Sequence, residues 1–288
     1  MLTIDDLLEA IEREEMEESK MPEVNLKDYD VIAINSSGGK DSALMTNVMI
    51  AAAKDQGVLD RVLIVHAIMA EEWQGTLELV QSHAEYYDVP FQSIARPQGH
   101  LLQHVRERGK WPSPTNRFCT SDHKRDQISK IYSELIQKFR AQGRRTAVKI
   151  LNCMGMRADE SPGRKKLAVL APNPRAYNAR REVDNYHPIH KVPDAEAYAS
   201  LAILPTTPHK CYDCGIKRAS CVICIYAPEH QIQKSAMIPE NRPLWEEYLD
   251  VEKQIDHKFK VDLSLREIED KIQSGKVVEV EDDGKWNM

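Results

Sequence analysis

Apolar and polar positions follow a regular order along the first half of the chain. Short apolar runs rich in β-branched residues predict strands over residues 31–34, 61–69, 90–95 and 147–153. Apolar positions at helical spacing predict helices over residues 43–53, 76–87 and 122–141. Strands that alternate with helices are typical of a parallel sheet. The pattern therefore predicts an α/β fold in which helices flank a parallel sheet.

The two ends of the chain carry different patterns. Apolar residues at helical spacing, in a stretch where the first 20 residues hold eight acids and two bases, predict an acidic N-terminal helix. Periodicity fades between residues 154 and 224, where Pro, Arg and Cys are frequent, and a helical pattern returns over residues 243–259. We therefore predict three parts: the acidic helix over residues 1–25, a central α/β domain over residues 26–200, and a cysteine-rich segment with a C-terminal helical cap over residues 201–288.

The composition is that of a chain able to bury a core. Apolar residues make up 42% of the 288 residues and charged residues 29%. The longest nearly apolar run, residues 62–70, is far shorter than the roughly 20 residues that span a bilayer. The N-terminus also lacks the basic and apolar blocks of a secretory signal. We expect a cytoplasmic protein that does not enter a membrane, whose six cysteines are thiolates or metal ligands rather than disulfide partners.

Charge is unevenly distributed along the chain. The formal net charge is −6, which argues against a protein that coats nucleic acid through bulk charge. Residues 144–181, however, contain ten bases and only two acids, a net charge of +8. A solvated surface accounts for many such runs, but clustered arginines also suit a polyanion such as ATP or a DNA backbone. Both interpretations stay open on charge alone.

A glycine turn lies between the first predicted strand and the helix after it. The turn consists of Ser36, Ser37, Gly38, Gly39, Lys40, Asp41 and Ser42. Unpaired amide groups and the positive end of the helix dipole meet at such a turn and attract phosphate. Lys40 and the serine hydroxyls add donors, and the Asp41 carboxylate would hold Mg²⁺ against the phosphate. The motif is not Walker A, because Asp41 follows Lys40 where Walker A has Ser or Thr.

The sequence Ser-Gly-Gly-Lys-Asp-Ser of this turn resembles the pyrophosphate loop of the PP-loop ATP pyrophosphatases. Three later blocks resemble the phosphoadenosine phosphosulfate reductase-like branch of that superfamily: residues 117–120 with Lys124, residues 155–161 with Arg164, and residues 186–189. The resemblance covers roughly residues 30–260 and implies a Rossmann-like fold of the adenine nucleotide alpha hydrolase type. It also implies that ATP is cleaved between its α and β phosphates and that AMP passes to an acceptor oxygen.

The resemblance also places the site residues. Five residues are expected to act in catalysis: Lys40, Asp41, Lys124, Arg157 and Arg164. The positive charges of Lys124, Arg157 and Arg164 would neutralise the pyrophosphate as it leaves, and positioning would supply the rest of the rate. Besides the turn itself, four residues of the block over residues 155–161 are expected to contact the nucleotide: Gly155, Asp159, Glu160 and Ser161. Asp159 or Glu160 would hold Mg²⁺ or the ribose.

Four cysteines form two closely spaced pairs, Cys211 with Cys214 and Cys221 with Cys224. Four thiolates within fourteen positions predict a metal site, and both zinc and a four-iron, four-sulfur cluster accept this ligand set. Spacing alone does not decide between the two metals, whereas the resemblance favours iron-sulfur. Outside the quartet, Cys119 follows Arg117 and precedes Lys124, charges expected to lower its pKa. Cys119 is therefore either a sulfur acceptor or an ordinary small core residue. Cys153 ends an apolar strand and is expected to be a core residue.

The resemblance extends to one kind of reductase-like protein. Residues 218–225 resemble the late cysteine block of proteins associated with DNA phosphorothioation. The leading hypothesis is therefore that ATP adenylates a DNA backbone phosphate, with sulfur supplied by a partner cysteine desulfurase and further phosphorothioation subunits. Reduction of an activated sulfate is less favoured, because no cysteine follows Cys224. Thiolation of tRNA, a regulatory subunit that binds nucleotide without turnover, and assembly into a homo-oligomer stay open.

Overall fold

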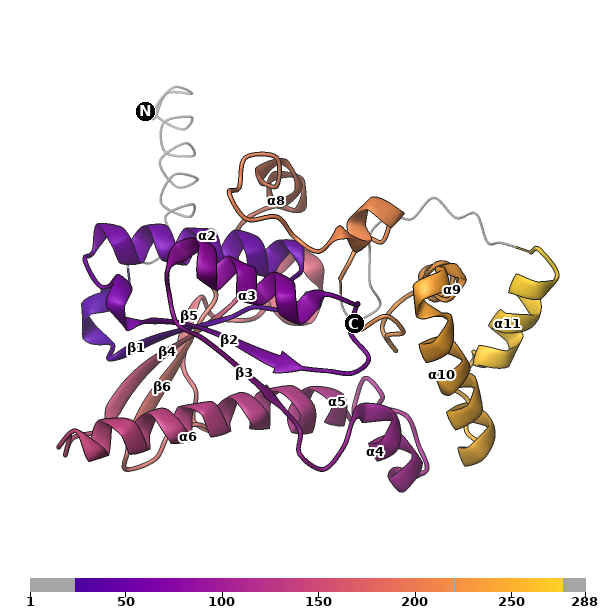
Figure 1. Ribbon diagram of the computed structural model, residues 1–288, viewed down its shortest axis with the longest axis horizontal. Helices are drawn as coiled ribbons and strands as arrows, with labels where there is room; N and C mark the ends of the chain where they lie inside the picture. The colour runs from indigo at the N-terminus through magenta and orange to yellow at the C-terminus, as the bar shows by residue number, and fades with distance from the viewer. Residues whose placement is uncertain (1–23, 220, 277–288) are drawn as a thin grey trace, which may run out of the picture.

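A six-stranded sheet forms the centre of the protein, with strand order β3-β2-β1-β4-β6-β5 (Figure 1). This computed structural model describes residues 24–219 and 221–276. The strands are β1 (Val31–Asn35), β2 (Val62–Ile68), β3 (Phe91–Ala95), β4 (Val148–Met154), β5 (Leu170–Pro172) and β6 (Arg181–Tyr186). All neighbouring pairs are parallel except β5 with β6, which is antiparallel. The predicted Rossmann-like α/β fold is confirmed.

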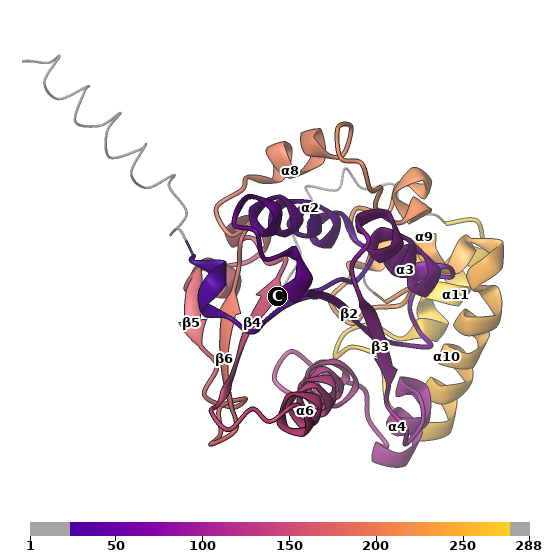
Figure 2. The same ribbon diagram turned by 60° about the vertical axis from the view of Figure 1, so that its left-hand side comes forward.

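Helices cover both faces of the sheet (Figures 1 and 2). The covering helices are α2 (Lys40–Asp55) and α3 (Thr76–Tyr87) on one face and α6 (Asp126–Ala141) on the other. Successive residues of a strand point to opposite faces, which explains why the first four residues of β1 are all apolar. Ile32 and Ile34 join the core that includes residues of α2 and α3. Val31 and Ala33 join the core on the α6 side.

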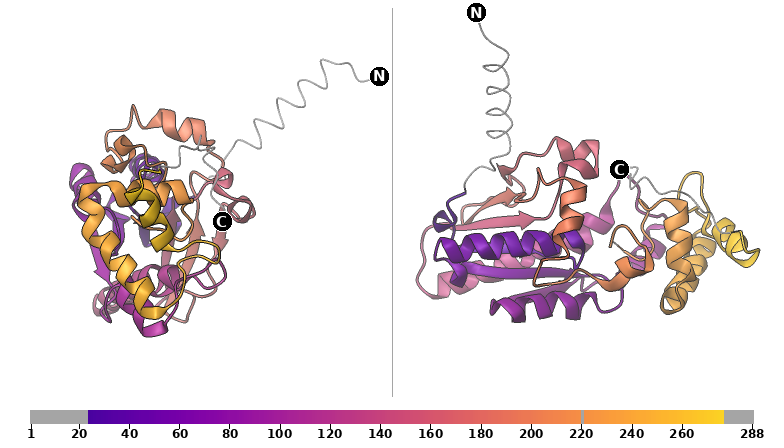
Figure 3. Two further views of the ribbon diagram at one scale, coloured as in Figure 1. Left: turned by 90° about the vertical axis from the view of Figure 1, so that its right-hand side faces the viewer. Right: turned by 90° about the horizontal axis from the view of Figure 1, so that it is seen from above.

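A third apolar core lies at one end of the sheet (Figure 3). The remaining helices are α4 (Leu101–Arg108), α5 (Phe118–Thr120), α7 (Pro162–Lys165), α8 (Asp194–Ser200), α9 (Glu229–Met237), α10 (Arg242–Ile255) and α11 (Leu265–Gln273). Side chains from α4, α9, α10 and α11 share this core, and Trp111 stacks on Tyr248 with ring centroids 5.4 Å apart. Cys211, Val222 and Ile223 belong to the same core. The cysteine segment therefore packs against the C-terminal helices.

The predicted elements of the first half agree with the structure within a few residues at each end. One difference is the helix predicted over residues 122–141, because Ser121–Arg125 form a π-helical turn and α6 begins at Asp126. The pattern does not predict α4, β5 or β6. Strand β6 has the sequence REVDNY, in which only Val183 and Tyr186 are apolar and the other four side chains are charged or amides. No apolar alternation is therefore visible in the sequence. Helix α4 has only three apolar residues, all of them at buried positions.

Two other predictions concern the ends of the chain and membranes. The acidic helix predicted over residues 1–25 falls outside the described residues, except for two that are not helical. Within the described part of the chain, no helix combines the length and apolarity that crossing a bilayer requires. The predicted helix over residues 243–259 corresponds to α10, which ends four residues earlier, at Ile255.

Candidate nucleotide site and cysteine pocket

The glycine turn lies at the carboxyl end of β1, at the point where the strand order reverses. Strand β2 pairs with one side of β1 and β4 with the other, so the connections leave in opposite directions there. Open α/β sheets bind their ligands at such a point. Within the turn, the Ser37 amide donates to Ser42 Oγ at 3.2 Å, and Ser42 Oγ donates to the Gly39 carbonyl at 2.8 Å. These bonds hold the turn against the first residues of α2.

Three glycines allow close approach at the turn. Gly38 has a φ of +71°, a left-handed conformation that favours glycine. A Cβ atom on Gly39 would lie 3.3 Å from the Ala219 carbonyl oxygen. A Cβ atom on Gly155 would lie only 2.8 Å from the Asp41 carbonyl oxygen, closer than real Cβ contacts. Gly155 follows β4, so the turns after β1 and β4 touch because a side chain is missing between them.

Four charged side chains meet above the turn. Lys40 Nζ lies 2.8 Å from Asp41 Oδ1 and 3.3 Å from Asp194 Oδ1. Arg157 Nε lies 2.7 Å from Asp41 Oδ1, and Arg157 Nη2 pairs with Asp194. Burial would raise the pKa of Asp41, but Lys40 and Arg157 outweigh it and lower that pKa. The predicted catalytic residues Lys40, Asp41 and Arg157 are thus brought together, with both cations almost fully buried.

The other residues of the block over residues 155–161, with Arg164, make hydrogen bonds and ion pairs within the protein. Glu160 pairs with Arg164 and lies 2.5 Å from Arg218, while it also accepts the Arg157 amide at 2.9 Å. Ser161 Oγ accepts the Arg164 amide at 3.2 Å and caps α7. Asp159 accepts the amide of Asp194 at 3.2 Å. Burial, followed by the nearby charge of Arg218, lowers the pKa of Arg164 to about 9, so its side chain stays charged at neutral pH.

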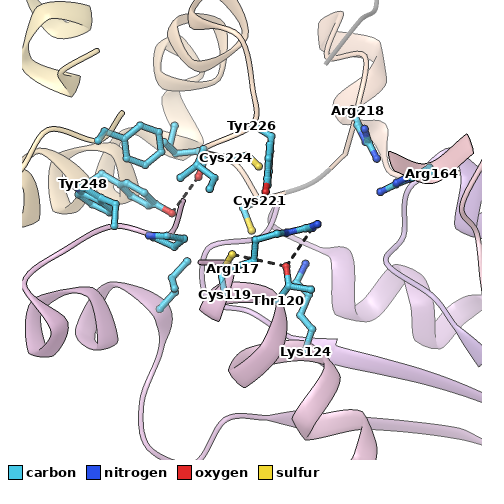
Figure 4. Close-up of a pocket in the computed structure, with 16 residues that line it drawn as sticks. Arg117, Cys119, Thr120, Lys124, Arg164, Arg218, Cys221, Cys224, Tyr226 and Tyr248 are labelled. Atoms are coloured by element: carbon cyan, nitrogen blue, oxygen red, sulfur yellow. Dashed lines mark hydrogen bonds between the residues drawn. The ribbon is translucent and has the colours of Figure 1, made fainter. Parts of the chain in front are cut away.

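A pocket of about 170 Å³ adjoins these arginines (Figure 4). Its charged lining residues are Arg117, Lys124, Arg164 and Arg218, and its cysteines are Cys119, Cys221 and Cys224. The Arg117 guanidinium lies 5.1 Å from the ring centroid of Tyr226, another lining residue. Lys124 and Arg164 therefore face the pocket, whereas Lys40, Asp41 and Arg157 belong to the turn. The pocket combines positive charge, aromatic rings and sulfur.

Burial is the main influence on the pKa of the cysteine thiols at this site. It raises the pKa of Cys221 to about 12 and that of Cys211 to about 12. The expectation that Arg117 and Lys124 lower the pKa of Cys119 is wrong, because burial outweighs both charges and raises that pKa. Cys153 is fully buried in the sheet core, as predicted for a core residue. Burial therefore favours the neutral thiol form of Cys119 and Cys221.

The structure does not bring the four predicted metal ligands together. Cys221 and Cys224 line the pocket beside Cys119, whereas Cys211 is buried in the third core and Cys214 is exposed. Among residues 24–219 and 221–276, no cluster of three or more His, Cys, Asp or Glu side chains has the arrangement that holds a metal ion. In this arrangement the four cysteines do not form one metal site.

Several site residues are not predicted from sequence. Asp194 pairs with both buried cations, and the Tyr212 hydroxyl oxygen accepts the Lys40 amide at 2.9 Å. His66 lies beneath the turn, with Nδ1 2.8 Å from the Ser36 carbonyl oxygen and Nε2 3.0 Å from Glu72. Asp194 and His66 belong to no sequence motif, and Tyr212 lies between Cys211 and Cys214 of the predicted metal site. Only a contact between distant segments identifies them.

The fold divides the basic stretch over residues 144–181. Four of its arginines are bound to other groups: Arg144 to Asp30, Arg157 to Asp41 and Asp194, Arg164 to Glu160, and Arg181 to Ser129 and Ala176. Lys165 and Lys166 are exposed next to Arg164. Arg175 and Arg180 are exposed in the β5–β6 turn, at the opposite edge of the sheet from the glycine turn. The stretch is therefore not one continuous basic surface.

A sequence profile of the phosphoadenosine phosphosulfate reductase domain family matches residues 31–227, more than half of the chain. The chain belongs to this family. The match includes the glycine turn, the turn after β4 and the pocket cysteines, so the predicted superfamily and branch are confirmed. No curated protein matches the chain. The phosphorothioation subtype is a finer assignment than the family.

Solved structures with similar folds share little sequence with this chain. The phosphoadenylyl-sulfate reductase from Candida auris, in a phosphate complex, is 13% identical, with a TM-score of 0.47 over 77% of this chain and 96% of that one. The FMN adenylyltransferase from Candida glabrata, in complex with FMN and an ATP analogue, is 10% identical, with a TM-score of 0.46 over 68% of this chain. This chain covers only 57% of that enzyme. The U34-tRNA thiolase NcsA from Methanococcus maripaludis, with its [4Fe-4S] cluster, is 14% identical, with a TM-score of 0.41 over 88% and 76%.

The contact between the two turns can be tested with Gly155→Ala. The new methyl group would overlap the Asp41 backbone, so we expect the free energy of unfolding to fall by about 2 kcal/mol in chemical denaturation. Gly163→Ala is the matched control, because the nearest atom to its Cβ would be 3.9 Å away and its stability should not change. Equal stabilities of the two variants would contradict the close approach of these turns.

Proposed function

We propose that this chain is an ATP pyrophosphatase that transfers AMP from ATP to an oxygen of the DNA backbone, as the adenylating component of DNA phosphorothioation. The observation that carries the proposal is the glycine turn with Lys40 and Arg157 at the point where the strand order reverses. Buried cations beside a helix N-terminus are suited to a chain of phosphates. The family match supports nucleotide chemistry at this turn.

The turn accounts for how ATP would be held. The amide groups at the start of α2, together with Lys40 and Arg157, would bind the terminal phosphates and neutralise charge on the departing pyrophosphate. Ser37 and Ser42 Oγ atoms, 3.4 Å apart, stand beside the same amides. The Asp41 carboxylate, which its lowered pKa keeps ionised, would hold Mg²⁺, and the ion would offset the charge of the phosphates.

The neighbouring pocket supplies a place for the acceptor. Arg164 and Arg218 line it, and both interact with Glu160, whose partner Arg157 belongs to the turn. An acceptor phosphate held by these arginines would lie beside the α phosphate of a nucleotide on the turn. Its oxygen would form a bond to the α phosphorus while the bond to pyrophosphate breaks. AMP then becomes the leaving group: a persulfide sulfur from a partner cysteine desulfurase would attack the backbone phosphorus as the bond to AMP breaks. A thiol would reduce the resulting S–S bond, which leaves the phosphorothioate and a disulfide.

Three features favour a nucleic-acid acceptor that undergoes sulfur chemistry. The pocket holds three cysteines next to four cationic side chains. Lys165 and Lys166 extend the positive charge from Arg164 to the surface. Residues 218–225 resemble the late cysteine block of phosphorothioation proteins. These features leave a choice between DNA and tRNA, which the acceptor dependence of turnover decides.

The loop assignment predicts the behaviour of Ser37→Ala and Asp41→Asn. Ser37→Ala should keep the fold, because it removes only a hydroxyl. Asp41→Asn keeps the shape of the side chain but removes a charge that pairs with Lys40 and Arg157, so its fold is checked by circular dichroism. We expect pyrophosphate release in the presence of ATP, Mg²⁺ and DNA to fall at least about 100-fold. Ser37→Ala removes a donor to the departing phosphates, and Asp41→Asn removes the carboxylate that would hold Mg²⁺ against them. A coupled pyrophosphate assay measures the loss, and Gly163→Ala serves as the active control. Release at the rate of the unmodified protein in both variants would refute the assignment.

The proposed DNA surface predicts that two lysines differ from two arginines of the same basic stretch. The double variant Lys165→Ala/Lys166→Ala should weaken DNA binding and lower the slope of log affinity against log salt by up to about 2. Arg175→Ala/Arg180→Ala removes the same charge from the opposite edge and should bind DNA normally. Fluorescence anisotropy over a salt series, with tRNA as a parallel ligand, measures both. Equal effects of the two pairs would contradict a DNA surface beside the pocket.

A further inference from the structure

Side chains of the chain itself already occupy the groups that would bind phosphate. The Asp194 carboxylate lies between Lys40 and Arg157 and pairs with both cations. The Tyr212 hydroxyl oxygen accepts the backbone amide of Lys40, a donor at the very start of α2. The Asp194 carboxylate therefore contacts the two cations, and the Tyr212 hydroxyl contacts the amide, to which phosphate oxygens would bind.

The segment that supplies these side chains touches the turn at further points. The Tyr198 ring, on the same helix as Asp194, lies with its centroid 4.6 Å from Lys40 Nζ. The amide of His209, three residues before Tyr212, donates to the Gly38 carbonyl at 2.8 Å. Residues 194–212 thus form a strap across the glycine turn.

Asp194 differs from the cations that it binds in how firmly it is buried. The Asp194 side chain is 55% exposed, whereas those of Lys40 and Arg157 are 4% and 2% exposed. The two cations are fixed in the core, whereas the half-exposed Asp194 carboxylate can move away from them into solvent. Its departure would leave two buried cations without one of their anions, which an incoming anion must replace.

We infer that Asp194 and Tyr212 are specificity-determining residues, which the phosphates of a nucleotide displace from the glycine turn. The inference rests on the proposed function, because it takes the turn as the nucleotide site. A ligand with several adjacent phosphates can replace the carboxylate at both cations and the hydroxyl at the Lys40 amide together. A small monoanion replaces one contact and loses the others. The strap therefore selects polyphosphate ligands, and its closed form lowers their apparent affinity.

The test measures binding of α,β-methylene-ATP with Mg²⁺, and separately of pyrophosphate, by isothermal titration calorimetry of the full chain. Asp194→Asn removes the competing charge, so we expect about a tenfold lower Kd for both ligands. Tyr212→Phe frees the Lys40 amide and should lower the Kd in the same direction. Glu196→Gln is the matched control, since Glu196 is an exposed acid in the first turn of the same helix. Its Kd should equal that of the unmodified protein.

Hydrogen exchange gives a second readout that does not depend on a variant. Binding of α,β-methylene-ATP to the unmodified protein should speed exchange of amides in residues 194–212. Binding with the same Kd in Asp194→Asn and Glu196→Gln, or with unchanged exchange in the strap, would overturn displacement while leaving the nucleotide site intact. Failure of the unmodified protein and of both Asp194→Asn and Tyr212→Phe to bind either ligand would overturn the proposed function itself.

Discussion

Compensation of buried charge at the start of helix α2 constrains the whole site. Lys40 and Arg157 are removed from water, and an unpaired charge in such a place costs several kcal/mol. Asp41 and Asp194 provide the compensation, so the turns after β1 and β4 and the start of α8 must meet at one point. The parallel pairing of β1 with β4 brings the two turns to the same edge, and Gly155 lets them touch.

The same constraint links the glycine turn to the cysteine pocket. Glu160 accepts the Arg157 amide and also binds Arg164 and Arg218, which line the pocket. On the other side, the Glu71 carbonyl accepts the amide of Val222, next to Cys221. The cysteine segment is therefore held between the carboxyl ends of the strands and the C-terminal helices. The glycine turn and the cysteine pocket are neighbours because Glu160 contacts the Arg157 backbone and both Arg164 and Arg218.

Local chemistry could be predicted from the sequence, and contacts between distant segments could not. The glycine turn was identifiable because its donors are consecutive residues between a strand and a helix. Asp194 and Tyr212 lie 154 and 172 residues from Lys40, so no pattern links them to it. For the cysteines, close spacing in the sequence does not determine where the side chains lie. Close spacing predicts one site, but packing buries Cys211, exposes Cys214 and places Cys119 beside Cys221 and Cys224.

Phosphorus-31 NMR of a turnover mixture tests the central claim most directly. The full chain is incubated with ATP, Mg²⁺ and double-stranded DNA, and the phosphorus resonances are followed over time. If the turn grips the terminal phosphates, the bond between the α and β phosphates breaks, and pyrophosphate appears in step with AMP or adenylated DNA. Accumulation of ADP and orthophosphate would show that the bond to the γ phosphate breaks instead, and would contradict the account.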